Sequence, residues 1–454
     1  MLDLPELDDA RLAAMLDLAK ERSKALGQRR RLRRRFTGLA ALVLVIGTAG
    51  AVAFHPRNGA GTDHQASNSG SHSSVARAPS WKLVGDVSQP SWQEQPSLTG
   101  PGRAYGLVCP TAMACYMQES DQPASGPVLT SVEVTQDGGS TWQQSLLPAG
   151  DSTSTRLACV DADTCMAGGS DSAGNAVFLT TDDGGQSWTV LPGPSQLASS
   201  FVFLDVSCTG GQSCVAIGQL AAGDNGAEQG YDVLLTTDAG QTWSASPLPS
   251  DLVPEQAQCL GGADCVITGW DAPSGDAAPS QGAAIYSTDS GATWAAATVP
   301  DGFGPVTAVS CADQNDCIAV TPEAASPGTS WVFATTDGGQ TWTLAAGAGL
   351  PAGFLQGLAC ATSSLCWAAG IQLAADPGTV GTPITLSSVQ GVLAVTNDGG
   401  QTWQTAQLPA DLSDHSVVTA VACPTATTCF ATVWLPNASP QGQYVLLSYD
   451  SSGN

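Results

Sequence analysis

The chain has 454 residues, of which 15 are lysine or arginine and 40 are aspartate or glutamate, giving a formal net charge of −25 at pH 7. An acidic surface repels phosphate groups, so this balance excludes nucleic acid as a partner. The charge is divided unevenly, because the first 36 residues contain ten basic and six acidic groups, whereas the rest contain five and 34.

The chain begins with a basic segment, residues 1–36, followed by an uncharged apolar run at residues 37–54. A helix of these 18 residues would be about 27 Å long, near the minimum for crossing a bilayer. The arginine cluster at 29–35 keeps the N-terminus in the cytoplasm. We therefore predict a single-pass signal anchor in the cell membrane, with everything after it outside the cytoplasm. A cleaved signal is the alternative, because residues 51–53 (Ala-Val-Ala) resemble a cleavage site.

Two further segments flank the apolar run. Residues 6–26 repeat apolar side chains at helical spacing, which predicts a short amphipathic helix that docks a cytoplasmic partner or lies on the membrane. An unstructured tail is the alternative there. Residues 55–78 are rich in glycine, serine, asparagine and histidine without apolar periodicity, and this composition is typical of a flexible linker.

Residues 79–454 are organised by a repeat of about 50 residues, which indicates an array of supersecondary units. Two cysteines six positions apart occur once in each of seven repeats: Cys109/Cys115, Cys159/Cys165, Cys208/Cys214, Cys259/Cys265, Cys311/Cys317, Cys360/Cys366 and Cys423/Cys429. Zinc needs four ligands, and each pair is isolated in its own repeat, so we predict disulfides and an oxidising compartment.

A second motif runs in phase with the cysteines and has the form Ser/Thr-x-Asp-x-Gly-x-Thr/Ser-Trp. We call it the aspartate turn, and its aspartates are Asp137, Asp183, Asp238, Asp289, Asp337 and Asp398. The carboxylate can accept backbone N–H bonds, the glycine supplies a positive φ, and the tryptophan buries a large ring. The motif resembles the Asp-box of the bacterial-neuraminidase-type repeat family, which includes sialidases, xyloglucanases and photosystem II assembly factors. The resemblance covers roughly residues 86–454.

The apolar segments between these motifs predict four short strands per repeat, named A to D. Strand A ends at the first cysteine, B starts at the second, C precedes the aspartate turn and D follows its tryptophan. This pattern predicts an all-β fold, a seven-bladed β-propeller of four-stranded antiparallel blades. The seventh repeat stops at Asn454 before its tryptophan, whereas Trp92 lies 17 residues before Cys109, within the usual spacing. We therefore predict that the Trp92 segment supplies the last strand D, with Trp81 and Lys82 just outside this closure.

The turns sort into two faces of the ring. In a four-stranded blade the A–B and C–D turns share one face, so the cysteine pairs and aspartate turns lie together. The B–C loops and D-to-A connections lie opposite, where the spacing from second cysteine to turn aspartate varies from 18 to 32 residues. Loops that vary usually carry function, so a site is expected on this second face.

Six of the seven B–C segments carry acidic residues: Asp121, Asp171, Asp224, Asp271 with Asp276, Glu323 and Asp376. These are either solvated loops or a rim that collects Ca²⁺ or a basic ligand, although single acids on separate loops are not an obvious calcium cage. No other cofactor and no metal site is predicted.

Aromatic residues fall at the same face. Trp270 and Trp434 end strands B, whereas Trp331 and Tyr444 begin strands C. They are either platforms for sugar rings or a protein, or they pack beneath loops. With Asp271 and Arg103 they form the predicted ligand-binding set.

Two other positions have structural predictions. Trp367 is expected in the core. Arg156 and Asp205 hold the same place in adjacent blades, which predicts an ion pair near the axis.

The resemblance to sialidases implies three arginines that clamp a carboxylate, but the propeller contains only Arg103 and Arg156. A serine triad would rest on His415 alone. We therefore predict a non-catalytic recognition or scaffold module for a protein or glycan, with no catalytic residue assigned. The alternative is a glycoside hydrolase with a carboxylate pair on the B–C face, Asp271 first. A third class is a sensor coupled to the cytoplasmic helix.

Overall fold

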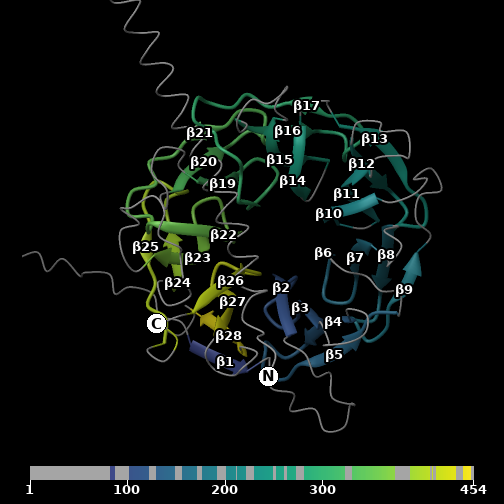
Figure 1. Cartoon of the computed structure of the whole chain (residues 1–454), viewed down its shortest axis with the longest axis horizontal. Helices are drawn as coiled ribbons and strands as arrows, with labels where there is room; N and C mark the ends of the chain where they lie inside the picture. Colours follow the sequence, from purple (N-terminus) through teal and green to yellow (C-terminus); the bar gives the residue numbers. More distant parts are fainter. Residues whose placement is uncertain are drawn as a thin grey trace, which may run out of the picture.

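The computed structural model forms a ring of seven four-stranded sheets around a common axis (Figure 1), which is the predicted seven-bladed β-propeller. Every strand pair is antiparallel. The structure describes residues 82–86, 102–121, 129–148, 156–170, 176–191, 201–210, 212–220, 230–248, 252–259, 263–271, 281–322, 330–373, 389–409, 412, 416–435 and 443–450. The predicted cytoplasmic segment, anchor and linker lie outside these ranges. Within them, no helix has the length and apolar character needed to cross a membrane.

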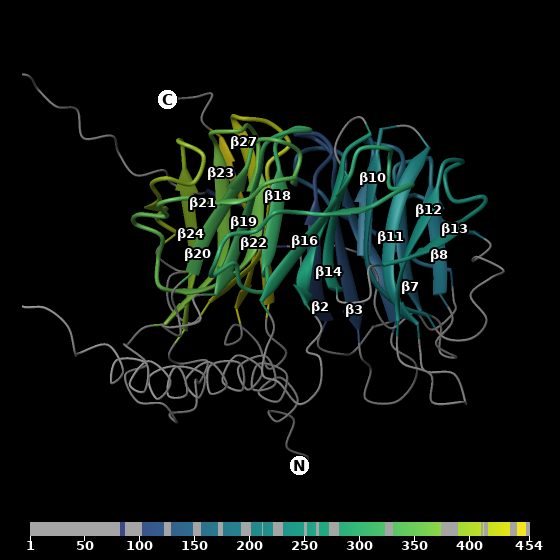
Figure 2. The same cartoon turned by 90° about the horizontal axis from the view of Figure 1, so that it is seen from above.

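Blades are numbered in chain order, and strands A to D run from the axis outward (Figure 1). Seen from the side, the strands run roughly along this axis (Figure 2). Blades 1 to 3 comprise β2 Gly102–Val108, β3 Cys115–Asp121, β4 Leu129–Thr135, β5 Gln143–Leu146; β6 Arg156–Cys159, β7 Cys165–Ser170, β8 Ala176–Thr181, β9 Thr189–Leu191; β10 Phe201–Thr209, β11 Ser213–Leu220, β12 Tyr231–Thr236, β13 Ser244–Pro247. Blades 4 and 5 comprise β14 Leu252–Cys259, β15 Cys265–Asp271, β16 Gly282–Ser287, β17 Ala295–Ala296; β18 Ala308–Cys311, β19 Cys317–Pro322, β20 Ser330–Thr335, β21 Thr343–Leu344. Blades 6 and 7 comprise β22 Gly353–Cys360, β23 Cys366–Leu373, β24 Val389–Thr396, β25 Gln404–Thr405; β26 Val417–Ala422, β27 Thr428–Leu435, β28 Gln443–Asp450, β1 Lys82–Asp86.

The hydrophobic core lies in the seams between blades. One cluster joins Val215 and Ile217 of blade 3 to Ile267 and Ile285 of blade 4, and all four side chains are almost fully buried. Because each sheet is covered on both faces, strand B of blade 4 is buried at five consecutive positions, Cys265 to Gly269, instead of alternating. The apolar runs that marked the strands in the sequence follow from this double burial.

The ring is closed by both ends of the chain, but not by the segment that was predicted. Strand D of blade 7 is β1, whose Lys82 lies opposite Ser448 of β28. The prediction that Trp92 supplies this strand, with Lys82 outside it, is wrong. Spacing favoured Trp92, but residues 93–96 (Gln-Glu-Gln-Pro) are polar and end in a residue without an N–H donor, whereas β1 contains Leu83 and Val84.

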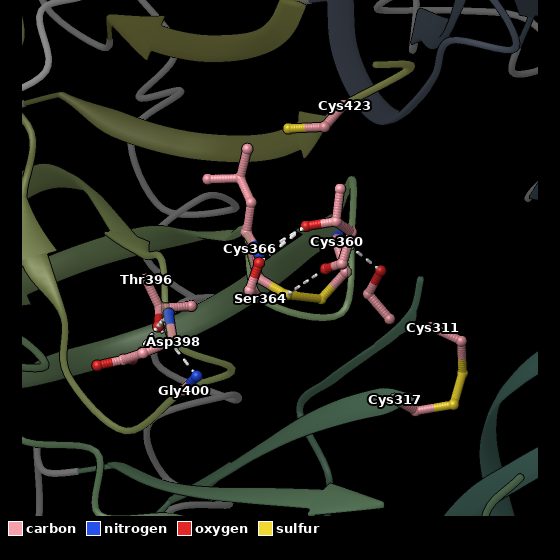
Figure 3. The surroundings of a disulfide bond; sticks show 12 residues. Cys311, Cys317, Cys360, Ser364, Cys366, Thr396, Asp398, Gly400 and Cys423 are labelled. Carbon is pink, nitrogen blue, oxygen red and sulfur yellow. Dashed lines mark hydrogen bonds between the residues drawn. A yellow bond between two sulfur atoms is a disulfide. The ribbon is translucent and has the colours of Figure 1, made fainter. Parts of the chain in front are cut away.

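All seven predicted disulfides are present, each joining the end of strand A to the start of strand B within one blade. Figure 3 shows the Cys360–Cys366 disulfide of blade 6 with Thr396, Asp398 and Gly400 of the aspartate turn. In this blade the A–B turn also accepts a bond from the aspartate turn, because Gly399 N donates to Ser364 O at 3.1 Å. Equivalent bonds occur in five other blades and start from Gly138, Gly184, Ala239, Ser290 and Gly338. The disulfides and aspartate turns therefore share one face, as predicted.

Three ends of strand A and two starts of strand B differ from the prediction by one residue. Strand A was expected to end at the first cysteine, but β2, β10 and β26 end at Val108, Thr209 and Ala422. Strand B was expected to start at the second cysteine, but β11 begins at Ser213, before Cys214, and β27 begins at Thr428, before Cys429. In both blades the preceding residue already pairs with a neighbouring strand, Ser213 with strand A and Thr428 with strand C. The cysteine marks the disulfide, whereas backbone pairing decides where the strand begins or ends, so the cysteine spacing alone misplaced these limits.

Cys214 and Cys429 also belong to the hydrophobic core. Cys214 is 6% exposed and lies in the cluster between blades 2 and 3, and Cys429 is 0% exposed in the cluster between blades 6 and 7. Their sulfur atoms are bonded in the disulfides Cys208–Cys214 and Cys423–Cys429. Both cysteines are therefore structural residues of the blade seams.

The bond between the aspartate turn and the A–B turn requires a left-handed backbone at the residue after the aspartate. Four blades have glycine there, including Gly138 at φ 71° and Gly399 at φ 68°. Blades 3 and 4 instead place Ala239 at φ 56° and Ser290 at φ 61°. A side chain in this region costs roughly 1–2 kcal/mol, so these two turns are strained.

We expect Ala239→Gly and Ser290→Gly each to raise the free energy of unfolding by about 0.5–1 kcal/mol, because relief of strain exceeds the extra entropy of an unfolded glycine. Thermal or denaturant unfolding would measure this. Ala295→Gly, in exposed strand β17, is the control and should lower stability. A lower unfolding midpoint for both turn variants would contradict the strain argument.

Candidate functional site

The six predicted ligand-binding residues lie at the ends of strands on the face opposite the disulfides. Trp270 and Asp271 end β15, Trp434 lies near the end of β27, Trp331 and Tyr444 lie near the starts of β20 and β28, and Arg103 lies near the start of β2. They are distributed over blades 1, 4, 5 and 7. The strand arrangement therefore puts them on one face without gathering all six into one site.

Trp270 and Trp331 face the same seam, between blades 4 and 5. On β15, Trp270 shares a face with Val266, which belongs to the core cluster of that seam. Trp331 packs against the same cluster from blade 5, and its ring lies 6.2 Å from that of Phe333. Both indoles are only partly buried. These are the two predicted site residues that the fold directs to one seam from different blades.

Trp331 is held rigidly from behind by a connecting loop. Gly302 approaches its indole so closely that a Cβ at that position would lie 2.2 Å from the ring carbon Cζ3. Gly302 also has φ 91°, which only glycine adopts readily. Next to it, Phe303 is 1% exposed and contacts Phe333 at a ring separation of 4.9 Å. The indole therefore has a fixed orientation while part of its surface remains open.

Trp434 and Tyr444 form a different pair. They lie opposite each other in β27 and β28, with ring centroids 6.4 Å apart and planes 28° apart. Tyr444 is 8% exposed and belongs to the cluster between blades 7 and 1, so its main role is packing. Arg103 lies in β2 opposite Ser120.

Asp271 is exposed, and its backbone N–H donates to Gln281 O at 3.0 Å. It adjoins Trp270 in β15, so the two side chains point to opposite faces of the sheet. Asp121 ends β3, and the remaining predicted rim acids lie outside the described residues: Asp171, Asp224, Asp276, Glu323 and Asp376. Across the part of the chain that is described, no group of three or more His, Cys, Asp or Glu side chains could hold a metal ion.

The aspartate turns use their carboxylates internally. Asp183 Oδ1 accepts bonds from Thr181 Oγ1 at 2.8 Å and Ser187 N at 2.9 Å, and Oδ2 accepts from Ser187 Oγ at 2.6 Å. These bonds, the Ser187 hydroxyl first, lower the pKa of Asp183 to about 2. The other five turns repeat the bond to the carboxylate from the residue four positions later. With their acceptor oxygens engaged in this way, these aspartates stabilise the turn.

Near the axis, the charge of Arg156 acts on Asp205, but both side chains form their hydrogen bonds with backbone groups. Arg156 Nε donates to the carbonyl of Leu204 at 3.1 Å, and the carboxylate of Asp205 accepts from Ala257 N at 2.9 Å. Burial raises the pKa of Asp205 to about 6, although the Arg156 charge acts in the opposite direction. No sequence pattern pointed to the partner in blade 4, because a backbone N–H has no residue signature.

Two remaining predictions concern single side chains. Trp367 is 0% exposed and belongs to the core, as predicted. His415, the residue on which a serine triad would depend, lies outside the described residues.

Acid should destabilise the aspartate turns in a defined pH window. Because the folded pKa of Asp183 is depressed, its stabilising effect is complete above about pH 4 and is lost as pH falls toward 2. We expect Asp183→Asn to lower the unfolding midpoint at pH 6 and to make the loss between pH 4 and 2 smaller than in the wild type. Asp301→Asn, at an exposed aspartate outside the turns, is the control. Parallel curves for Asp183→Asn and wild type would count against this role.

No family model matches the chain, and no curated protein matches it. Among solved structures, YCF48 from Cyanidioschyzon merolae is 12% identical, with 83% of this chain and 99% of that one covered and a TM-score of 0.48. YCF48 bound to D1 peptide is 20% identical over 67% and 94%, with a TM-score of 0.38. A Trypanosoma rangeli sialidase bound to 2,3-difluorosialic acid is 10% identical over 82% of this chain and 57% of that one, at 0.43. These values are too low to carry an argument about ligand or activity.

Proposed function

We propose that the protein is a membrane-anchored propeller of the Asp-box repeat class that acts as a non-catalytic recognition or scaffold module outside the cytoplasm. One observation carries the binding role: Trp270 and Trp331 face the same seam from adjacent blades, on the face with variable loops. Partly exposed, rigid aromatic side chains are typical anchors of binding surfaces. The seven disulfides indicate an oxidising environment, which supports the extracytoplasmic location.

The charge of the chain restricts the classes of ligand that can bind. After residue 36 the chain contains 34 acidic and five basic groups, so an anionic glycan would be repelled. A neutral glycan can stack on the two indoles, and a protein ligand with basic side chains would be attracted by the acidic surface.

The binding role is tested by measuring retention of the full chain, purified in detergent, on neutral polysaccharides and on basic proteins. For the retained ligand, we expect Trp331→Ala to weaken binding by tenfold or more, since an aromatic anchor contributes more than about 1.4 kcal/mol. Leu344→Ala, at an exposed leucine on outer strand β21, is the control and should leave binding unchanged. Equal loss in both variants would contradict a site at Trp331.

A glycoside hydrolase is the second candidate, because Asp271 is an exposed carboxyl at the end of β15, on the face with variable loops. Such enzymes need two carboxylates about 5–9.5 Å apart. If the protein is a hydrolase, it releases reducing ends from a bound polysaccharide, and Asp271→Asn reduces this release by more than a hundredfold. Retention of a polysaccharide without release would eliminate this candidate.

The anchor is proposed at residues 37–54. We expect the full chain to remain in the membrane fraction after alkaline carbonate extraction, and a variant without residues 1–54 to be released. The alternative, a cleaved signal, predicts a soluble mature protein that begins after residue 53, which intact mass measurement would detect.

A further inference from the structure

The innermost strands of the propeller present an unpaired edge to the neighbouring blade, and side chains bond to that edge. Ser207 Oγ in blade 3 accepts from Cys259 N of blade 4 at 2.8 Å. Ser310 Oγ in blade 5 accepts from Cys360 N of blade 6 at 3.0 Å. Both serines directly precede the first cysteine of their blade. These bonds satisfy backbone groups that an open edge would leave without a protein partner.

A second set of bonds comes from the residue three positions before the first cysteine. In blade 4 this residue is Gln256, whose Oε1 accepts from Val309 N of blade 5 at 2.9 Å and whose Nε2 donates to Thr307 O at 3.3 Å. In blade 3 it is Asp205, whose Oδ2 accepts from Ala257 N of blade 4 at 2.9 Å. In both seams the donor lies two residues before the next blade's first cysteine.

Asp205 and Gln256 both follow a β-bulge in their own strand. A β-bulge interrupts the register of β10 between Phe203 and Asp205, and another interrupts β14 between Pro254 and Gln256. Bulges redirect the side chain that follows them. The carboxyl of Asp205 therefore bonds blade 3 to blade 4 in the same way as the neutral carboxamide of Gln256 bonds blade 4 to blade 5.

Charge is what distinguishes the two seams. The strands packed against β10 carry two charged residues, Arg156 on β6 and Glu255 on β14, whereas β7, β8 and β11 carry none. Arg156 is fixed next to Asp205, because its Nε bonds to the carbonyl of Leu204. It is the cation positioned to compensate a charged Asp205.

We propose that the contact between the inner strands of blades 3 and 4, which we call the joint, responds to pH. The joint is stable by itself when Asp205 is neutral, and it depends on the positive charge of Arg156 when Asp205 is ionised. Burial raises the pKa of Asp205 to about 6, from an ordinary value of 3.8. At a pH between these two pKa values, Asp205 keeps its proton while the joint is closed and releases it when the joint opens. The stability of the joint therefore falls as pH rises through about 4 to 6. The seam between blades 4 and 5 has no such dependence, because the amide of Gln256 does not ionise.

Hydrogen exchange of the Ala257 amide in the full chain, corrected for the intrinsic effect of pH, reports opening of this joint. In the wild type we expect opening to increase tenfold or more between pH 4.5 and 7.5, because Asp205 ionises on opening. Arg156→Gln should increase opening further at pH 7.5 and have little effect at pH 4.5. Asp205→Asn keeps the size and the acceptor oxygen, and should make opening independent of pH.

Two further variants provide matched comparisons. Gln256→Glu places a carboxyl in the seam between blades 4 and 5, and should create the same pH dependence at the Val309 amide. Asp232→Asn removes another carboxyl of blade 3 whose pKa is raised by burial, and should leave the Ala257 amide unchanged. Equal pH dependence in wild type and Asp205→Asn, or an equal effect of Arg156→Gln at both pH values, would overturn the proposal.

Discussion

Each blade of this propeller has both faces buried against its neighbours, and this double burial governs the rest of the structure. A blade alone would expose the apolar side chains of clusters such as the one joining Val215 and Ile217 to Ile267. Stability therefore depends on closing the ring, and the pairing of β1 with β28 provides the last outer strand. The disulfides, aspartate turns and inner-strand bonds serve to keep seven sheets aligned well enough for these seams to pack.

Features that recur in every blade could be read from the sequence, because repetition amplifies a local signal. The seven cysteine pairs located the A–B turns, and the aspartate turns located the ends of strands C. Burial of Trp367 also followed from its place beside a cysteine. Features that occur once were not predictable in this way. Spacing selected Trp92 for the closing strand, yet Lys82–Asp86 pairs with β28, because a terminal segment is not bound to the spacing of internal repeats.

The candidate site also contains features that the sequence predicts and features that it does not. The sequence placed Trp270, Trp331, Trp434 and Tyr444 at strand ends on one face, but it could not show which seam each would enter. That depends on the alternation of side chains along a strand and on which neighbour covers each face. Trp434 and Tyr444 pair with each other, whereas Trp270 and Trp331 face one seam. The role of Gln256 was also invisible, because its partners are the backbone groups of Thr307 and Val309.

The seam that Trp270 and Trp331 face lies next to the seam that Asp205 bonds across, and this arrangement bears on both proposals. Trp270 and Trp331 belong to the seam between blades 4 and 5, which Gln256 holds with one accepted and one donated bond from a neutral amide. Asp205 holds the preceding seam, and the residue that donates to it, Ala257, adjoins Gln256 in β14. A change in the charge of Asp205 therefore acts one residue away from Gln256, which bonds blade 4 to blade 5. Because Gln256 makes its bonds without ionising, the bonds between the inner strands of blades 4 and 5 do not depend on pH, whereas the contact made by Asp205 does.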